Sequence, residues 1–133
     1  MNKVIVASLI VMMLAIGGMY TLLHGNTNSP AIITEGSTTN VTTLDGTQQI
    51  QINAKSGYLP HVTRAKANMP TVINVTTDGT YDCSSSLNIP SIGFRKSLPA
   101  SGTTPIEIPP QKPGTSLKGI CGMGMYNFAV NFN

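Results

Sequence analysis

The sequence predicts an all-β protein, a β-sandwich that follows a hydrophobic segment at the N-terminus. Polar and apolar residues alternate over residues 49–53 and 126–132, and residues 71–77 are rich in β-branched side chains. Residues 61–66 look extended, short apolar pieces lie at 87–89 and 105–108, and turns rich in Gly and Pro separate these segments. No segment after the hydrophobic one keeps a helical period. Short strands at regular spacing with such turns are typical of a β-sandwich.

The N-terminal segment is predicted to be a membrane anchor over residues 1–23. Residues 4–23 contain no charged side chain, and at about 1.5 Å per residue a helix of that length spans the roughly 30 Å hydrocarbon core of a bilayer. A cleaved secretory signal is the competing interpretation. Its apolar core is usually only about 7–15 residues long, and no small-residue cleavage site follows Leu23. We therefore expect a single-pass anchor in the lipid bilayer.

The rest of the chain divides into a linker and a head. Residues 24–48 are rich in Thr, Asn, Ser and Gly, a composition that favours a flexible linker. Residues 49–133 are expected to form the folded domain. Its charges are scattered without a basic run, which gives no support to nucleic-acid binding. Nucleophile–base arrangements and Gly-rich phosphate loops are also missing from the sequence, so we do not expect an enzyme.

Sulfur-bearing side chains alternate near the C-terminus, where Cys121, Met123 and Met125 are separated by glycines. In an extended chain alternate side chains share one face, and glycine lets the backbone bend closely around a bound group. Thiolate and thioether donors together favour copper(I) over zinc, calcium or magnesium. The pattern predicts a copper(I) site.

The residues alone leave three alternatives open. Cys83 and Cys121, the two cysteines of the chain, could form a structural disulfide that joins the two sheets of an extracellular interaction module. A structural zinc site needs four ligands, but His24 follows the hydrophobic segment and His61 has no paired spacing. An electron-transfer blue-copper site uses two His and one Cys with a weak axial Met. No histidine lies between Cys121 and Met125.

Several motifs of the head resemble those of cupredoxin domains. They are Gly57-Tyr58-x-Pro60, the strand at 71–75, the isolated Cys83, Pro109-Pro110, Pro113-Gly114 and Cys121-x-Met123-x-Met125. In blue-copper cupredoxins the upstream ligand is a histidine, whereas Cys83 takes that place here. Together with the N-terminal segment, this arrangement resembles the membrane-anchored copper(I) chaperones of the CupA type found in streptococci.

The resemblance implies a Greek-key cupredoxin-like sandwich that binds two copper(I) ions. Cys83 and Cys121 would hold one ion tightly as a thiolate pair, and Met123 and Met125 would hold a second, weaker and more exposed ion. It also implies that copper(I) passes to the metal-binding domain of a copper-exporting P-type ATPase.

The side of the membrane is a point of conflict. Lys3 precedes the uncharged stretch 4–23 and no Lys or Arg follows until Lys55, so the positive-inside rule places the head outside the cell. The acceptor domain implied by the resemblance is cytoplasmic, and thiols stay reduced in that compartment. We expect the cytoplasmic face, because the predicted ligands need reduced sulfur.

Overall fold

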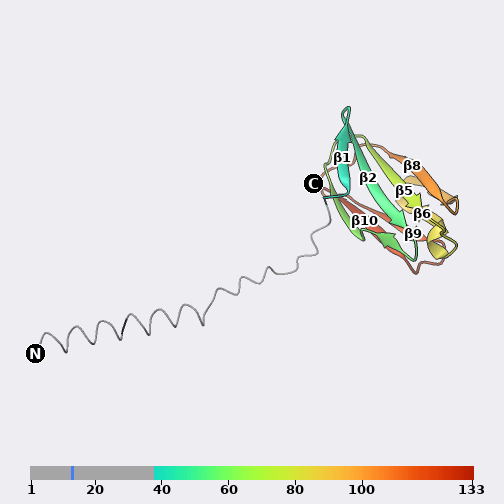
Figure 1. Ribbon diagram of the computed structural model, residues 1–133. Coiled ribbons are helices and arrows are strands. Elements are labelled where there is room, and N and C mark those ends of the chain that lie inside the picture. The colour runs from blue at the N-terminus through green and yellow to red at the C-terminus, as the bar shows by residue number, and fades with distance from the viewer. Residues whose placement is uncertain (1–12, 14–37) are drawn as a thin grey trace, which may run out of the picture. The chain divides into compact units, whose positions relative to one another are not determined.

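Residues 38–133 fold into two β-sheets that pack face to face (Figure 1). In this computed structural model the described residues are 13 and 38–133. The sandwich belongs to the second of two units into which the chain divides, Met1–Ile33 and Thr34–Asn133. The predicted anchor, apart from Met13, lies outside the described residues. Within the described part, no helix is long and apolar enough to cross a membrane.

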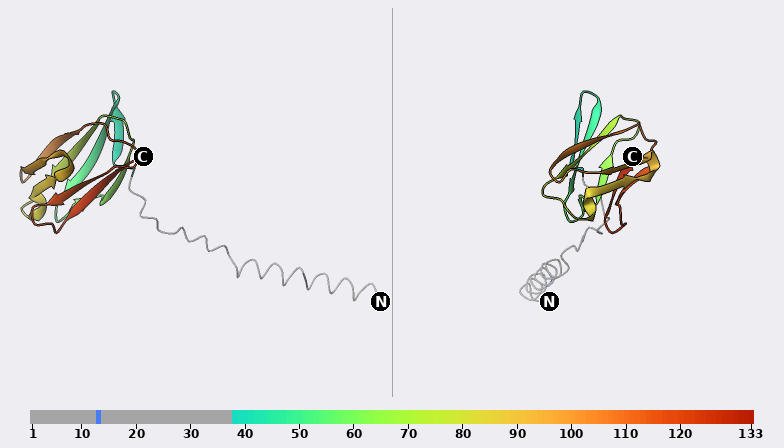
Figure 2. Two further views of the ribbon diagram at one scale, coloured as in Figure 1. Left: turned by 180° about the vertical axis from the view of Figure 1, so that it is seen from behind. Right: turned by 90° about the vertical axis from the view of Figure 1, so that its right-hand side faces the viewer.

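Each sheet has five strands, and the two layers are visible in Figure 2. One sheet has the order β1-β2-β5-β8, with β3 also pairing with β2, and the other has the order β4-β10-β9-β6-β7. Strands β2 and β5 are parallel, as are β4 and β10, and the other pairs are antiparallel. The elements are β1 (Val41–Leu44), β2 (Thr47–Ala54), β3 (Tyr58–Leu59), β4 (Val62–Ala65), β5 (Thr71–Thr77), η1 (Cys83–Ser85), β6 (Ser86–Ile89), η2 (Pro90–Ile92), β7 (Phe94–Ser97), β8 (Gly102–Ile108), β9 (Ser116–Cys121) and β10 (Asn127–Phe132). The predicted all-β sandwich is confirmed.

The sandwich begins before Gln49, the residue at which the sequence placed the start of the head. Strand β1 and the first residues of β2 both precede it. The side-chain amide of Asn40 donates hydrogen bonds to the Gln51 carbonyl and the Thr63 hydroxyl, both at 2.9 Å, and so joins this segment to both sheets. Strand β1 is an edge strand with a mostly exposed, Thr-rich sequence. Such a strand shows little alternation of polar and apolar residues. It therefore falls in the predicted linker 24–48, whose composition it shares.

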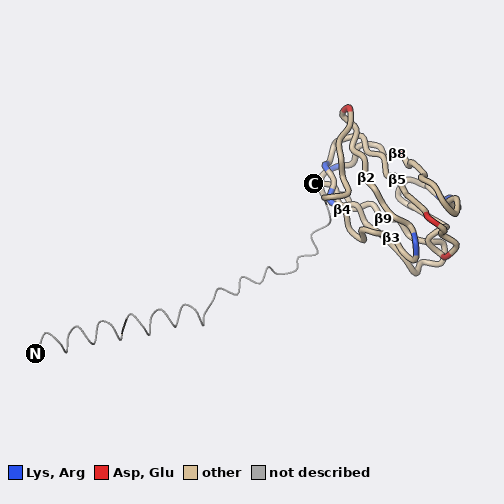
Figure 3. Tube along the Cα trace, in the orientation of Figure 1, with Lys and Arg blue, Asp and Glu red and all other residues tan. Residues whose placement is uncertain are grey.

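The core lies between the sheets and is filled by the side chains that alternate strand positions direct inward. The largest fully buried side chains are Tyr58, Phe128, Phe132, Ile50, Ile52, Ile73, Leu87, Ile89, Leu117, Gln48, Val75 and Val130. The rings of Tyr58 and Phe128 meet edge to face, with their centroids 5.3 Å apart, a favourable aromatic geometry. Charged residues are scattered over the described part of the chain (Figure 3).

One inward position of strand β9 is a glycine, which leaves room for an aromatic ring. Gly119 faces the core between the buried residues Leu117 and Cys121, and it is paired with Phe128 on β10. A Cβ atom at Gly119 would lie 2.2 Å from the Phe128 ring, a distance that no pair of non-bonded carbon atoms tolerates. The glycine is therefore required by packing.

We expect Gly119→Ala to lower the free energy of unfolding by about 1–3 kcal/mol, because the added methyl group overpacks the core against Phe128. Urea unfolding followed by circular dichroism measures the change. Lys118→Ala is the matched control on the same strand. Lys118 is exposed, and the control should stay within about 0.5 kcal/mol of the wild-type protein. Equal stability of the two variants would contradict this account of the packing.

Candidate metal centre

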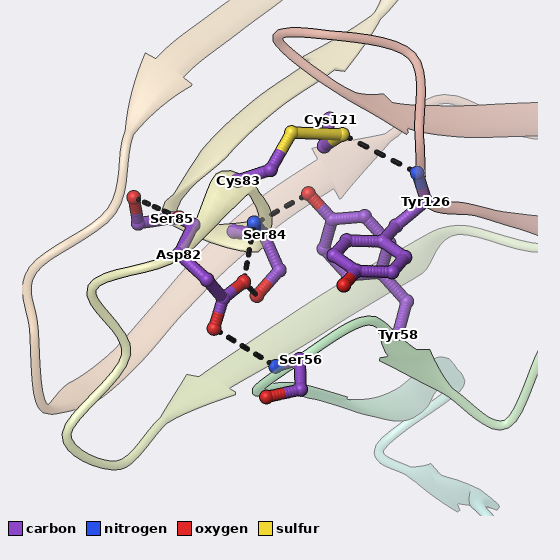
Figure 4. Close-up of a disulfide and its surroundings, with 8 residues drawn as sticks. All are labelled: Ser56, Tyr58, Asp82, Cys83, Ser84, Ser85, Cys121 and Tyr126. Carbon is purple, nitrogen blue, oxygen red and sulfur yellow. Dashed lines mark hydrogen bonds between the residues drawn. A yellow bond between two sulfur atoms is a disulfide. The ribbon is translucent and has the colours of Figure 1, made fainter.

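The two cysteines are brought together by the pairing of β6 with β9. Leu87 on β6 lies opposite Cys121 on β9, and the Gly122 N–H donates to the Ser86 carbonyl at 2.8 Å. This pairing places η1, which immediately precedes β6, against the end of β9. Cys83 is the first residue of η1 and Cys121 the last of β9, and they form a disulfide with their Cα atoms 5.7 Å apart (Figure 4).

The disulfide differs in one respect from the alternative that the sequence left open. That alternative joined the two sheets of the sandwich. The bond instead joins η1, which lies on the connection from β5 to β6, to β9 in the sheet that contains β6. The bond therefore links the turn before β6 to the end of β9 and does not join one sheet to the other.

The chain turns directly after Cys121. The Gly124 N–H donates to the Cys121 carbonyl at 2.9 Å, and Gly124 has a φ of +74° that favours glycine. The segment is thus not extended, and its three sulfurs do not share one face. The Cys121 side chain is directed into the core and the residue is only 2% exposed, whereas Met123 and Met125 are 79% and 64% exposed.

The turn closes around Cys121 through the backbone of Tyr126. The Cys121 N–H donates to the Tyr126 carbonyl at 2.9 Å, and the Tyr126 N–H donates to Cys121 Sγ at 3.3 Å. An N–H donor directed at sulfur stabilises negative charge on it. This contact could not be predicted from the sequence, because it is made by a main-chain group that any residue type other than proline could supply.

Asp82 starts the turn that carries Cys83. As the N-cap of η1, its carboxylate accepts hydrogen bonds from the Ser84 hydroxyl, the Ser84 N–H at 2.8 Å and the Ser56 N–H at 2.9 Å. These hydrogen bonds, with that of the Ser84 hydroxyl the largest contribution, lower the pKa of Asp82. The carboxylate therefore organises the backbone beside Cys83.

Tyr58 supports the same turn from the core. Its hydroxyl donates to the Ser84 carbonyl at 3.1 Å (Figure 4). Burial raises the pKa of Tyr58 to about 12, and the negative charge of Asp82 adds to the rise. The hydroxyl therefore remains a neutral donor throughout the physiological pH range.

The exposed side of the centre adjoins a hollow of about 510 Å³. Its lining includes Cys121 and Met123 from β9 and the turn after it, and Ser86, Asn88 and Arg95 from β6 and β7. Among the described residues, no three His, Cys, Asp or Glu side chains cluster as a metal site. His61 is exposed at the bend before β4. The sulfur atoms are thus the soft donors that this end of the sandwich offers.

Residues 19–130 match the family of cupredoxin-like domains. The chain belongs to this family. Among solved structures, the chain is similar to the metal-binding domain of the Cu(I)-exporting P-type ATPase CopA of Streptococcus pneumoniae D39. The two share 22% sequence identity with a TM-score of 0.63, and the match covers 70% of this chain and 92% of that one. A copper-binding protein in its apo form gives 22% identity and a TM-score of 0.65, over 74% and 97%. At this identity the likeness shows the fold. No curated protein matches the sequence.

We expect Asp82→Ala to destabilise the protein at pH 7, and the deficit to shrink in acid. The pKa of Asp82 is lowered from its model-compound value of 3.8, so the contribution of the carboxylate is present above that value and is lost as the pH falls through the lower folded-state pKa. Urea unfolding in steps from pH 7 to pH 2 measures the difference from the wild-type protein.

Asp78→Ala is the control for this experiment. Within residues 38–133 the Asp78 carboxylate makes a 3.9 Å ion pair with Lys55, and both side chains are exposed, so its loss should have little effect at either end of the pH range. A deficit for Asp82→Ala that stays constant with pH would rule out the role assigned to the charged carboxylate.

Proposed function

We propose that this chain is a membrane-anchored copper(I) chaperone or buffer that serves copper homeostasis and resistance. It binds copper(I) through Cys83, Cys121, Met123 and Met125 and passes the ion to a copper-exporting P-type ATPase. The observation that carries the proposal is the juxtaposition of Cys83 with Cys121 next to a turn that exposes two methionines. Membership of the cupredoxin-like family and the likeness to copper-binding domains support it.

The cysteine pair supplies the tight site in its reduced form. Two-electron reduction of the disulfide leaves two thiolates on a backbone whose Cα atoms are 5.7 Å apart. Thiolates are strong soft ligands for copper(I). The Tyr126 N–H, which donates to Cys121 Sγ, stabilises the anionic form of that ligand. Because Cys121 is almost fully buried, an ion held there is shielded from water on one side.

The methionine pair supplies a weaker site at the surface. Thioethers are neutral and need no deprotonation, so they bind copper(I) more labilely than thiolates do. Met123 and Met125 are largely exposed, and Met123 lies beside the hollow that Cys121 also lines. Copper(I) would arrive at and leave from this pair. Transfer would proceed by stepwise replacement of one sulfur ligand by another, without a change in oxidation state.

The anchor and the acceptor complete the proposal. Residues 1–23 would tether the head to the membrane and so raise its effective concentration near a membrane-embedded exporter. The head would lie on the cytoplasmic side, where cysteines stay reduced. The likeness to the metal-binding domain of a Cu(I)-exporting ATPase supports an acceptor of the same fold. The sulfurs of the acceptor would replace those of this chain on the copper ion one at a time.

The disulfide itself favours a second candidate, an extracellular interaction module stapled by Cys83 and Cys121. In that case the cysteines are structural, and oxidised protein is the working form. Such a module has no need of exposed methionines. This second candidate predicts that the activity of the protein does not depend on copper.

The test is an anaerobic copper(I) titration of the reduced full chain in detergent micelles against a competing chelator. We expect one ion to bind tightly. Cys83→Ser or Cys121→Ser should each weaken that binding by at least about a hundredfold, or about 2.7 kcal/mol, because a thiolate ligand is lost. Unchanged affinity in Cys83→Ser would contradict the chaperone site. Failure of the reduced wild-type protein to compete with the chelator would favour the stapled module.

Replacing the methionine pair should affect a different ion. We expect Met123→Ala/Met125→Ala to lose a weaker second ion while tight binding changes by less than about tenfold, because thioethers contribute less than thiolates. Met69→Ala is the matched control. It removes a half-buried methionine that lies just before β5, at the strand end opposite η1. If Met69→Ala lost the second ion equally, the assignment to Met123 and Met125 would be wrong.

A further inference from the structure

The two sulfurs of the disulfide have different surroundings. Cys121 is 2% exposed and belongs to the buried core, whereas Cys83 is only partly buried and packs against the edge of that core. Thiol–disulfide exchange requires the incoming thiolate to reach one of the two sulfurs, and its rate depends on access. Access favours attack at Cys83.

The hydrogen bonding of the sulfurs is also unequal. Cys121 Sγ accepts the Tyr126 N–H at 3.3 Å, whereas no group among the described residues donates a hydrogen bond to Cys83 Sγ. When a disulfide is cleaved, the sulfur whose thiolate is better stabilised leaves faster. The N–H offsets part of the cost of burying a charged sulfur at Cys121, so Cys121 can leave as the thiolate when Cys83 is attacked.

Packing favours the same direction. A group attached to Cys121 would have to fit against its core neighbours, among them Leu87 on the adjacent strand, and overpacking a core is costly. Cys83 lies on η1 outside the fully buried core and is only partly buried. A group attached to Cys83 therefore displaces less of the packed core than one attached to Cys121.

We propose that Cys83 is a site of reversible S-thiolation, at which a low-molecular-weight thiol opens the disulfide and Cys121 leaves as the thiolate. The attacking thiolate forms a bond to Cys83 Sγ as the Cys83–Cys121 bond breaks, and the electron pair of that bond stays on Cys121. A second thiol molecule then attacks the sulfur of the bound thiol. It releases the small-molecule disulfide and leaves Cys83 as a thiolate. The two electrons come from the two thiol molecules.

This inference rests on the proposed function in one respect, because it names the reaction that makes the copper ligands available. The exchange chemistry is independent of copper. A chain that failed to bind copper(I) could still show it, and a chain that bound copper(I) tightly could still lack it. The two proposals can therefore fail separately.

The experiment treats the oxidised full chain, in detergent micelles, with reduced glutathione. Samples are quenched in acid, alkylated with N-ethylmaleimide and digested with trypsin. Cleavage after Lys66, Arg95 and Lys118 places Cys83 in peptide 67–95 and Cys121 in peptide 119–133. We expect glutathione on 67–95 and maleimide on 119–133, in at least about tenfold excess over the opposite pattern, because the incoming thiolate reaches Cys83 more easily than the buried Cys121. Equal labelling, or glutathione mainly on 119–133, would overturn the proposal.

Single-cysteine variants decide the matter if the mixed disulfide does not accumulate. With oxidised glutathione, Cys121→Ser, which keeps Cys83, should form the adduct at least about tenfold faster than Cys83→Ser, because the buried Cys121 thiol is less accessible. In urea the two variants should react at similar rates, since burial is then lost. Equal or reversed rates in the folded proteins would refute the assignment.

Discussion

The candidate centre depends on the pairing of β6 with β9. Cys83 and Cys121 are 38 residues apart in sequence, and nothing local would bring them together. The ladder that sets Leu87 opposite Cys121 fixes where η1 begins relative to the end of β9. The two sulfurs meet because a sheet register, specified by alternating buried side chains, leaves them no other position. Sulfur chemistry at this end of the molecule is thus a consequence of core packing.

A continuous set of contacts connects that core to the centre. Gly119 leaves space for the Phe128 ring, which meets the ring of Tyr58 edge to face. The Tyr58 hydroxyl in turn holds the Ser84 carbonyl beside Cys83. Asp82 fixes the same turn from the other side. Ligand positions set by packed and hydrogen-bonded neighbours are more rigid than positions on a free loop, which suits a cysteine pair. The methionines lack such support, which suits labile binding.

The sequence predicted those parts of the structure that depend on alternation and composition. Residues 71–77 form β5, and the patterns at 49–53 and 126–132 lie within or overlap β2 and β10. Strand β1 could not be found, because an exposed Thr-rich edge strand has little apolar signal. That Cys121, Met123 and Met125 bind copper(I) stays a prediction, but the extended geometry expected for them is wrong, because the chain turns at Gly124. The Tyr126 N–H contact to Cys121 could not be predicted, since a main-chain donor does not depend on the type of residue.

Both candidate functions place Cys83 and Cys121 in contact, so the adjacency of the two sulfurs does not by itself distinguish them. The methionines make the difference. A stapled sandwich gains nothing from two large apolar side chains that are 79% and 64% exposed and contribute little to burial. A copper(I) carrier requires soft donors that solvent and a partner can reach. The turn at Gly124 directs Met123 and Met125 outward while Cys121 remains in the core, and this separation of a buried sulfur from exposed ones is the arrangement that a transfer route requires.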